Sequence, residues 1–126
     1  MVLLDTSVWV RFLYGQEPFF SKTRTLLLDQ QAAGHELVYG ELLMGDWGGR
    51  RGLLADYVRM HQVKRIAHAE VVSLVQLRRL YGRGIGWIDV HLLASALAAR
   101  VPLWTADTRL TAIAEELDVG YRLHHA

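Results

Sequence analysis

The sequence contains no cysteine, only two prolines and, among its 14 basic residues, only two lysines, Lys22 and Lys64. The absence of cysteine excludes disulfide bonds, thiolate catalysis and cysteine-bound zinc. No apolar run approaches the roughly 20 residues that a membrane-spanning helix needs, and the first residues lack the pattern of a signal peptide. We therefore expect a protein of the cytoplasm, a reducing compartment, with no membrane association.

Hydrophobic residues are plentiful and make up 52% of the 126 positions. A chain of this length and composition can bury a sizeable core without a stabilising metal or disulfide. We find no internal repeat and no low-complexity segment. We therefore expect one domain over residues 1–126.

The formal net charge of the chain is only +1. If a bound cation neutralised four of the 13 acidic residues, however, the 14 basic residues would outnumber the nine acids that remain. Most of the basic residues are arginines, which bind phosphate through a planar fork and stack on bases. This balance weakly favours a polyanionic partner, although arginines that only solvate helices are the alternative for most positions.

The first nine residues join a short apolar run to a carboxylate. Residues 2–4 are apolar without alternation, which predicts a strand buried on both faces. Asp5 follows at the carboxyl end of this strand, the edge of an α/β sheet at which ligands bind. Asp5 is therefore either a functional residue or the N-cap of the helix that the pattern from Val8 to Leu13 predicts.

Alternating strands and helices are predicted along the rest of the chain. Strands are expected at residues 36–39, 63–66, 101–105 and 119–123. Helices are expected at residues 21–32, before a stop at Gly34, and at 41–44, 50–61, 69–81, 87–99 and 109–117. This alternation predicts an α/β fold, a three-layer sandwich with a mainly parallel central sheet and helices on both faces.

Four acidic residues follow predicted strands or lie in the first turn of predicted helices: Asp5, Glu41, Asp89 and Asp107. Such positions open on one edge of a parallel sheet, and clustered carboxylates resist joint ionisation unless a cation neutralises them. A ligand set made only of oxygen favours Mg²⁺ or Mn²⁺ over zinc. Judged one by one, Asp89 and Asp107 could equally be helix N-terminal acids, and Glu41 a solvated one.

Two hydroxyl residues, Ser7 and Thr105, each stand two positions from one of these acids. They are candidates to orient a carboxylate or a metal-bound water, and capping or packing is the alternative. His91 stands two positions after Asp89 on a helix that turns it away, which favours a structural role. The terminal pair His124–His125 is not expected to bind a metal.

Four segments of the sequence resemble the PIN-domain family and, within it, the VapC toxins of bacterial toxin–antitoxin pairs. These segments are Leu-Leu-Asp5-Thr-Ser-Val-Trp, Gly-Glu41-Leu-Leu-Met-Gly, Gly84-Ile-Gly-Trp-Ile-Asp89-Val-His-Leu-Leu-Ala-Ser and Leu-Trp-Thr-Ala-Asp107. They occur in the order of the family over nearly the whole chain, and the block that begins at Gly84 is the most specific. One departure is Leu110, where many members have phenylalanine, and this difference affects packing rather than chemistry.

The resemblance implies a Mg²⁺-dependent endoribonuclease in which Mn²⁺ can substitute. By position, its catalytic and metal-binding acids are Asp5, Glu41, Asp89 and Asp107, with Asp5 and Asp89 as the central ligands. The expected reaction is hydrolysis of an RNA phosphodiester by a metal-activated water, without a protein nucleophile. The resemblance also implies a homodimer and a small VapB-type antitoxin that binds and silences the enzyme.

Phosphoryl transfer through a covalent intermediate on Asp5 is one alternative function. Haloacid dehalogenase-like enzymes need a second acid two residues later, where this chain has Ser7. A receiver domain would need a lysine after a late strand, but the only lysines are Lys22 and Lys64. Both variants of this alternative are disfavoured.

A non-catalytic α/β module that binds nucleic acid or protein is the other alternative. In it the acids would be relics, and exposed aromatic residues would contact a partner such as the antitoxin. Candidate contacts are Trp47 and the pair Phe19-Phe20, although aromatic residues are more often buried. Loss of one of the four acids would mark such a module, and none is lost.

Overall fold

A small parallel sheet lies at the centre of the protein. The computed structural model describes residues 1–123. Its three strands are β1 (Val2–Leu4), β2 (Ala32–Ala33) and β3 (Leu103–Trp104), in the order β2-β1-β3. Every pairing is parallel. The carboxyl ends of the strands therefore meet at one edge, as the sequence predicted.

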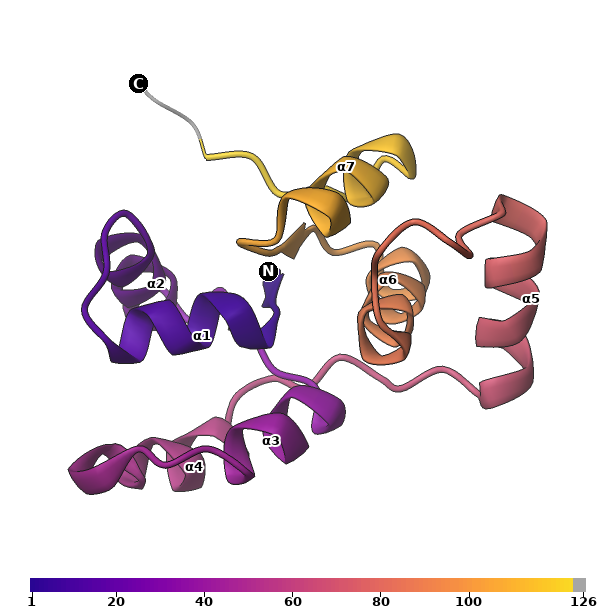
Figure 1. Ribbon diagram of the computed structural model, residues 1–126. Helices are drawn as coiled ribbons and strands as arrows, with labels where there is room; N and C mark the ends of the chain where they lie inside the picture. The colour runs from indigo at the N-terminus through magenta and orange to yellow at the C-terminus, as the bar shows by residue number, and fades with distance from the viewer. Residues whose placement is uncertain (124–126) are drawn as a thin grey trace.

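Helices cover the sheet on both sides. Figure 1 shows α1 and α2 on one side of β1 and α5 and α6 on the other, which confirms the predicted α/β fold. The helices are α1 (Thr6–Leu13), α2 (Phe19–Leu28), α3 (Glu36–Leu43), α4 (Gly52–Tyr57), α5 (His68–Arg78), α6 (Trp87–Ala99) and α7 (Thr108–Glu116), with a 3₁₀ helix at Gly48–Arg50. Within residues 1–123, no helix is long and apolar enough to span a membrane.

The hydrophobic core is built around β1, whose three residues are all buried. Trp9 of α1 is fully buried and packs edge-on against Tyr57, with the ring centroids 5.5 Å apart. Residues 92 and 93 of α6 are buried as well. Because both faces of β1 are covered, its apolar run needs no polar alternation.

The strand predicted at residues 36–39 is wrong, because these residues form the first half of α3. His35 caps this helix: its Nδ1 accepts a hydrogen bond of 3.1 Å from the amide of Leu37. The strand lies earlier, at Ala32–Ala33, where helix 21–32 was expected to continue; that helix ends at Leu28. Glu41 therefore lies in the last turn of α3, not at a strand exit.

Two further predicted strands are reduced to single bridges. Residues 63–66 form no strand, and the nearest pairing joins Gly34 to Gln62. Residues 119–123 contribute only the bridge between Leu103 and Gly120. The helix expected at 50–61 is shorter, at Gly52–Tyr57, and the one expected at 41–44 belongs to α3. The pair His124–His125 lies outside the described residues.

Candidate active site

Asp5 lies at the carboxyl end of β1, and only 4% of its surface is exposed. Its Oδ1 accepts hydrogen bonds from the hydroxyl of Ser7 (2.5 Å) and from the amide of Val8 (3.1 Å). Asp5 is thus the N-cap of α1, one of the two roles that the sequence allowed. Burial raises the pKa of Asp5, whereas the hydroxyls of Ser7 and Thr105 and the Val8 amide lower it.

A hydroxyl pair connects the exits of β1 and β3. The Ser7 hydroxyl accepts a hydrogen bond of 2.9 Å from the amide of Ala106, and it lies 3.4 Å from the hydroxyl of Thr105. Thr105 in turn accepts from the amide of Asp107 at 3.0 Å. These contacts hold the chain segments that carry Asp5 and Asp107 against each other.

Asp89 and Asp107 each stabilise the start of a helix. Oδ2 of Asp89, in the first turn of α6, accepts from the amide of Gly86 at 3.0 Å. Oδ1 of Asp107 accepts from the amides of Arg109 (2.8 Å) and Leu110 (3.0 Å) and caps α7. Asp89 is half-buried and Asp107 is exposed. The helix-capping role that the sequence allowed for these acids is therefore real.

Capping does not explain why these three acids gather without a positive partner. The charge of Asp89 raises the pKa of Asp5, and the charge of Asp107 adds to the effect of burial in raising the pKa of Asp89. The negative charge of Asp89 therefore acts on Asp5, and that of Asp107 acts on Asp89. In residues 1–123 the only ion pairs join other residues, Arg65 with Glu36 and Arg83 with Glu116.

Glu41 lies apart from this row, exposed on α3. It is nevertheless tied to the start of α1, because the hydroxyl of Thr6 donates to its carboxylate at 2.5 Å. Thr6 is the residue next to Asp5, so α3 brings Glu41 to the edge of the site. No sequence pattern indicated this role of Thr6, since the first residue of a helix is often Thr without any such contact.

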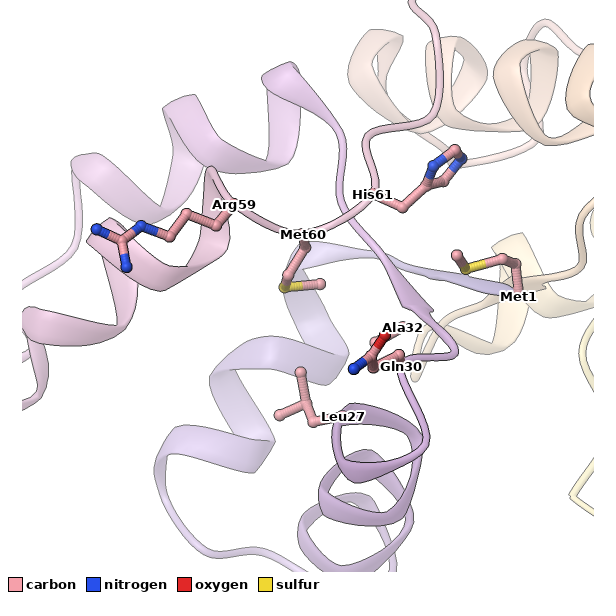
Figure 2. A pocket seen from close by; sticks show the side chains of 7 residues that line it. All are labelled: Met1, Leu27, Gln30, Ala32, Arg59, Met60 and His61. Atoms are coloured by element: carbon pink, nitrogen blue, oxygen red, sulfur yellow. The ribbon is translucent and has the colours of Figure 1, made fainter.

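A cavity of about 300 Å³ lies at the opposite edge of the sheet, where the strands begin (Figure 2). Met1 precedes β1 there, and Ala32 starts β2. None of its lining residues is acidic: Met1, Leu27, Gln30, Ala32, Arg59, Met60 and His61. This cavity is therefore separate from the acids.

Comparison with known proteins supports the resemblance seen in the sequence. Residues 2–116, a range that includes all four acids, match the PIN domain. The chain belongs to the PIN-domain family. This PIN domain is 40% identical over 121 residues to Ribonuclease VapC32 of Mycobacterium tuberculosis, in strains CDC 1551 / Oshkosh and ATCC 25618 / H37Rv, with 95% of each chain covered.

A solved structure shows the same fold. The crystal structure of PAE2754 from Pyrobaculum aerophilum superposes with a TM-score of 0.58 at 19% sequence identity, covering 88% of this PIN domain and 82% of that chain. Identity this low carries the fold and not the activity.

The PIN-domain acids offer only oxygen donors, which suit a hard cation, but their side chains do not converge on one metal position. As they stand, residues 1–123 contain no group of three or more His, Asp or Glu side chains that could hold a metal ion. However, Oδ1 of Asp89 and Oδ2 of Asp107 accept no hydrogen bond from the described residues. Carboxylate oxygens left free beside neighbouring negative charges are the kind of donor that hard cations such as Mg²⁺ and Mn²⁺ prefer.

The remaining aromatic and histidine residues differ in their surroundings. Trp47, considered above as an exposed partner contact, is instead buried, and its indole N–H donates to the carbonyl of Leu42 at 2.6 Å. Phe19 and Phe20 are half-buried. His91 is buried against the ring of Trp87, with centroids 4.9 Å apart.

Proposed function

We propose that the protein is an endoribonuclease that hydrolyses RNA phosphodiester bonds with Mg²⁺, for which Mn²⁺ can substitute. The observation that carries this proposal is the row of Asp5, Asp89 and Asp107, in which Asp89 repels Asp5 and Asp107 repels Asp89, without a cationic partner in residues 1–123. The 40% identity to Ribonuclease VapC32 supports RNA as the substrate.

A divalent cation, when bound, supplies the charge that activates water and stabilises the departing oxygen of the phosphodiester. Asp5 and Asp89 would hold it centrally, with Asp107 and Glu41 completing the shell directly or through water. Asp5 is suited to this role because its amide donates to the carbonyl of Trp104 at 3.0 Å, which fixes its backbone to the sheet.

Ser7 and Thr105 would position Asp5. Their hydroxyls favour the ionised carboxylate, the form that a cation requires. Burial of Asp5 also strengthens its attraction for a bound cation, because a carboxylate shielded from water attracts positive charge more strongly than a solvated one. Without a cation, the same burial raises the pKa of Asp5 and disfavours its ionised form.

We also propose that a VapB-type antitoxin silences the enzyme at this site. A basic side chain of the antitoxin would neutralise the acid row as a cation does, through a charge-assisted hydrogen bond. The similarity to a VapC protein and the absence of a positive partner for the row within residues 1–123 support this proposal. Purified antitoxin should then weaken Mn²⁺ binding in proportion to its occupancy.

A homodimer is proposed as well. Large apolar side chains are exposed around the connection between α5 and α6: Leu77, Tyr81 and Trp87 are 80%, 64% and 44% exposed. Exposed apolar surface of this kind is typical of protein interfaces. Light scattering coupled to gel filtration should give twice the mass of the chain.

The nuclease proposal is tested with purified, antitoxin-free protein and total cellular RNA, with chelator and metal add-back. Asp5→Ala should abolish cleavage with a nearly unchanged circular dichroism spectrum, and Asp5→Asn, which retains the cap, should do the same. Glu41→Ala should leave trace activity at high Mn²⁺, because Glu41 is exposed and peripheral. Asp56→Ala, at an exposed acid of α4, is the control.

Wild-type cleavage that survives the chelator, or an Asp5→Asn variant that cuts at the wild-type rate, would contradict the proposal. The non-catalytic binding module would then take its place. If the proposal holds, sequencing of RNA ends after brief induction identifies the RNA that is cut.

A further inference from the structure

A groove of about 540 Å³ opens beside the acid row. Its walls come from the end of β3, from α7, from the start of α2 and from residues 120–123. Thr105 and Ala106 line its end nearest the acids, where they contact Ser7 and the amide of Asp107. Through Thr105 and Ala106 the groove therefore adjoins the candidate active site, although none of the three acids lines it.

Three aromatic rings run along this groove, and a cation lies over each end of the row. Phe19 stacks on Trp104 with centroids 5.7 Å apart and an interplanar angle of 20°. The ring of Tyr121 lies next to that of Trp104, with the centroids 5.5 Å apart. Cζ of Arg11 lies 5.6 Å from the centroid of the Phe19 ring, and Nζ of Lys22 lies 5.9 Å from the centroid of the Tyr121 ring. We call these five residues the aromatic row.

The aromatic row differs from an ordinary core cluster in what covers its ends. Trp104 is buried and forms its centre, but Phe19 and Tyr121 are only half-buried. Aromatic rings in a protein core are covered by apolar side chains, whereas the two outer rings of this row are each covered by a cationic side chain. A cation over a partly exposed ring is held weakly, and an unpaired base stacks on the same ring more strongly. A base can therefore displace Lys22 from Tyr121 and leave its ammonium for the adjacent phosphate.

We propose that the groove binds an unpaired ribonucleotide of the RNA substrate next to the cleaved bond, with its base on Tyr121 and its phosphate at Lys22. This inference rests on the proposed ribonuclease function. Aromatic stacking combined with basic side chains is how proteins hold single-stranded RNA, whose bases can be turned outward. Glu115 of α7 also lines the groove and repels phosphate, which directs the backbone toward Lys22 and Arg122.

The experiment measures the affinity of the full chain for a fluorescent, unstructured ten-nucleotide RNA in chelator, where no cleavage occurs. Tyr121→Leu should weaken binding about tenfold, within the range that loss of one base stack causes, and Tyr121→Trp should retain it. The matched control is Tyr14→Leu, at an exposed tyrosine outside the groove whose ring also lies under a cation, that of Arg50. It should bind the RNA and cut it as the wild type does.

Lys22→Gln tests the phosphate contact separately, because it removes the charge and keeps most of the side chain. It should lower the slope of log affinity against log salt by about 0.7, the value for one phosphate contact of a single strand. An RNA of the same length made of abasic sugar-phosphate units should bind weakly, and Tyr121→Leu should not weaken it further.

Equal affinities of Tyr121→Leu and Tyr14→Leu would overturn the inference, as would wild-type protein that does not bind the RNA or prefers a duplex. Cleavage is measured in parallel with Mg²⁺. RNA binding that depends on Tyr121 without any cleavage would retain the groove and refute the nuclease. Cleavage without this dependence would retain the nuclease and refute the groove.

Discussion

The side-chain hydroxyls of Ser7 and Thr105 lie 3.4 Å apart and join two segments that are almost 100 residues apart in the sequence. Ser7 also donates to Asp5 and accepts from the amide of Ala106. One small side chain therefore holds the carboxylate at the exit of β1 and the backbone at the exit of β3. This contact sets the spacing of the acids that the two exits carry.

Ser7→Ala should reduce both stability and RNA cleavage. The Ala106 amide loses its partner, which should lower the free energy of unfolding by about 1–3 kcal/mol. The pKa of Asp5 should rise further because a hydroxyl that lowers it is gone, so the cleavage profile should move to higher pH. Urea unfolding and cleavage rates from pH 5 to 9 measure both effects. Ser73→Ala, at an exposed serine of α5, should change neither.

The sequence was sufficient to predict β1, α6 and the edge at which the acids lie. Residues 2–4 are apolar without a break, and only a strand covered on both faces uses such a run. The strand predicted at residues 36–39 was wrong because Leu-Val-Tyr favours a strand. The N-cap of the helix that forms there is His35, and histidine is not one of the usual capping residues. The strand at Ala32–Ala33 is too short and too rich in alanine to be recognised from its sequence.

The positions of the candidate acids on the fold were predictable from the sequence, but the contacts between them were not. Asp5, Asp89 and Asp107 precede or begin helices, a position that sequence patterns show well. The contact of Thr6 with Glu41 depends on how α1 packs against α3, and no pattern contains that information. The aromatic row was missed for the same reason, because it joins three segments that are distant in the chain.

Asp89→Asn should melt at a higher temperature than the wild type at pH 7 without metal. Burial and the charge of Asp107 raise the pKa of Asp89 above its ordinary value of 3.8. An acid with a raised pKa binds its proton more tightly in the folded state, so stability falls as pH rises through that pKa. The difference between variant and wild type should vanish below pH 3.8.

Metal should reverse this order. Mg²⁺ or Mn²⁺ relieves the repulsion only in the folded state, so wild-type protein should gain melting temperature and Asp89→Asn should gain much less. Thermal melts with metal and with chelator give the comparison. Equal melting temperatures of both proteins under both conditions would refute an acid cluster that binds a cation.

His35 should make the protein less stable in mild acid. Burial lowers the pKa of His35 below its ordinary value of 6.5. Its Nδ1 accepts from the Leu37 amide, so Nε2 carries the proton and donates to Ser95 at 2.9 Å. The folded state favours the neutral ring of His35. Its contribution to stability is therefore complete above pH 6.5 and is lost as pH falls toward the lowered pKa. His35→Asn, which can still cap α3, should remove this pH dependence from urea unfolding between pH 5 and 7. An unchanged slope would contradict it.

Gly84→Ala should weaken the site from a distance, through the loop before α6. Arg83 holds this loop to α7 through two hydrogen bonds to Glu116, of 2.7 and 3.3 Å. Gly84 has a φ of +83°, and a Cβ there would lie 2.6 Å from Nη1 of Arg109. The exposed side chain of Arg109 can move away, so the cost falls on the strained backbone of the loop, which carries the Gly86 amide that holds Asp89.

Gly82→Ala places the same kind of backbone strain farther along the chain from the Gly86 amide. Gly82 has a φ of +71°, but a Cβ there would meet nothing within 4 Å. Both variants should lose about 1–2 kcal/mol of stability because a side chain is disfavoured in the left-handed region. Gly84→Ala alone should lose part of the metal-induced gain in melting temperature, because its strained residue lies two positions from the Gly86 amide that holds Asp89. If the two variants respond equally to Mn²⁺, the loop does not position Asp89, and its contacts with α7 serve stability alone.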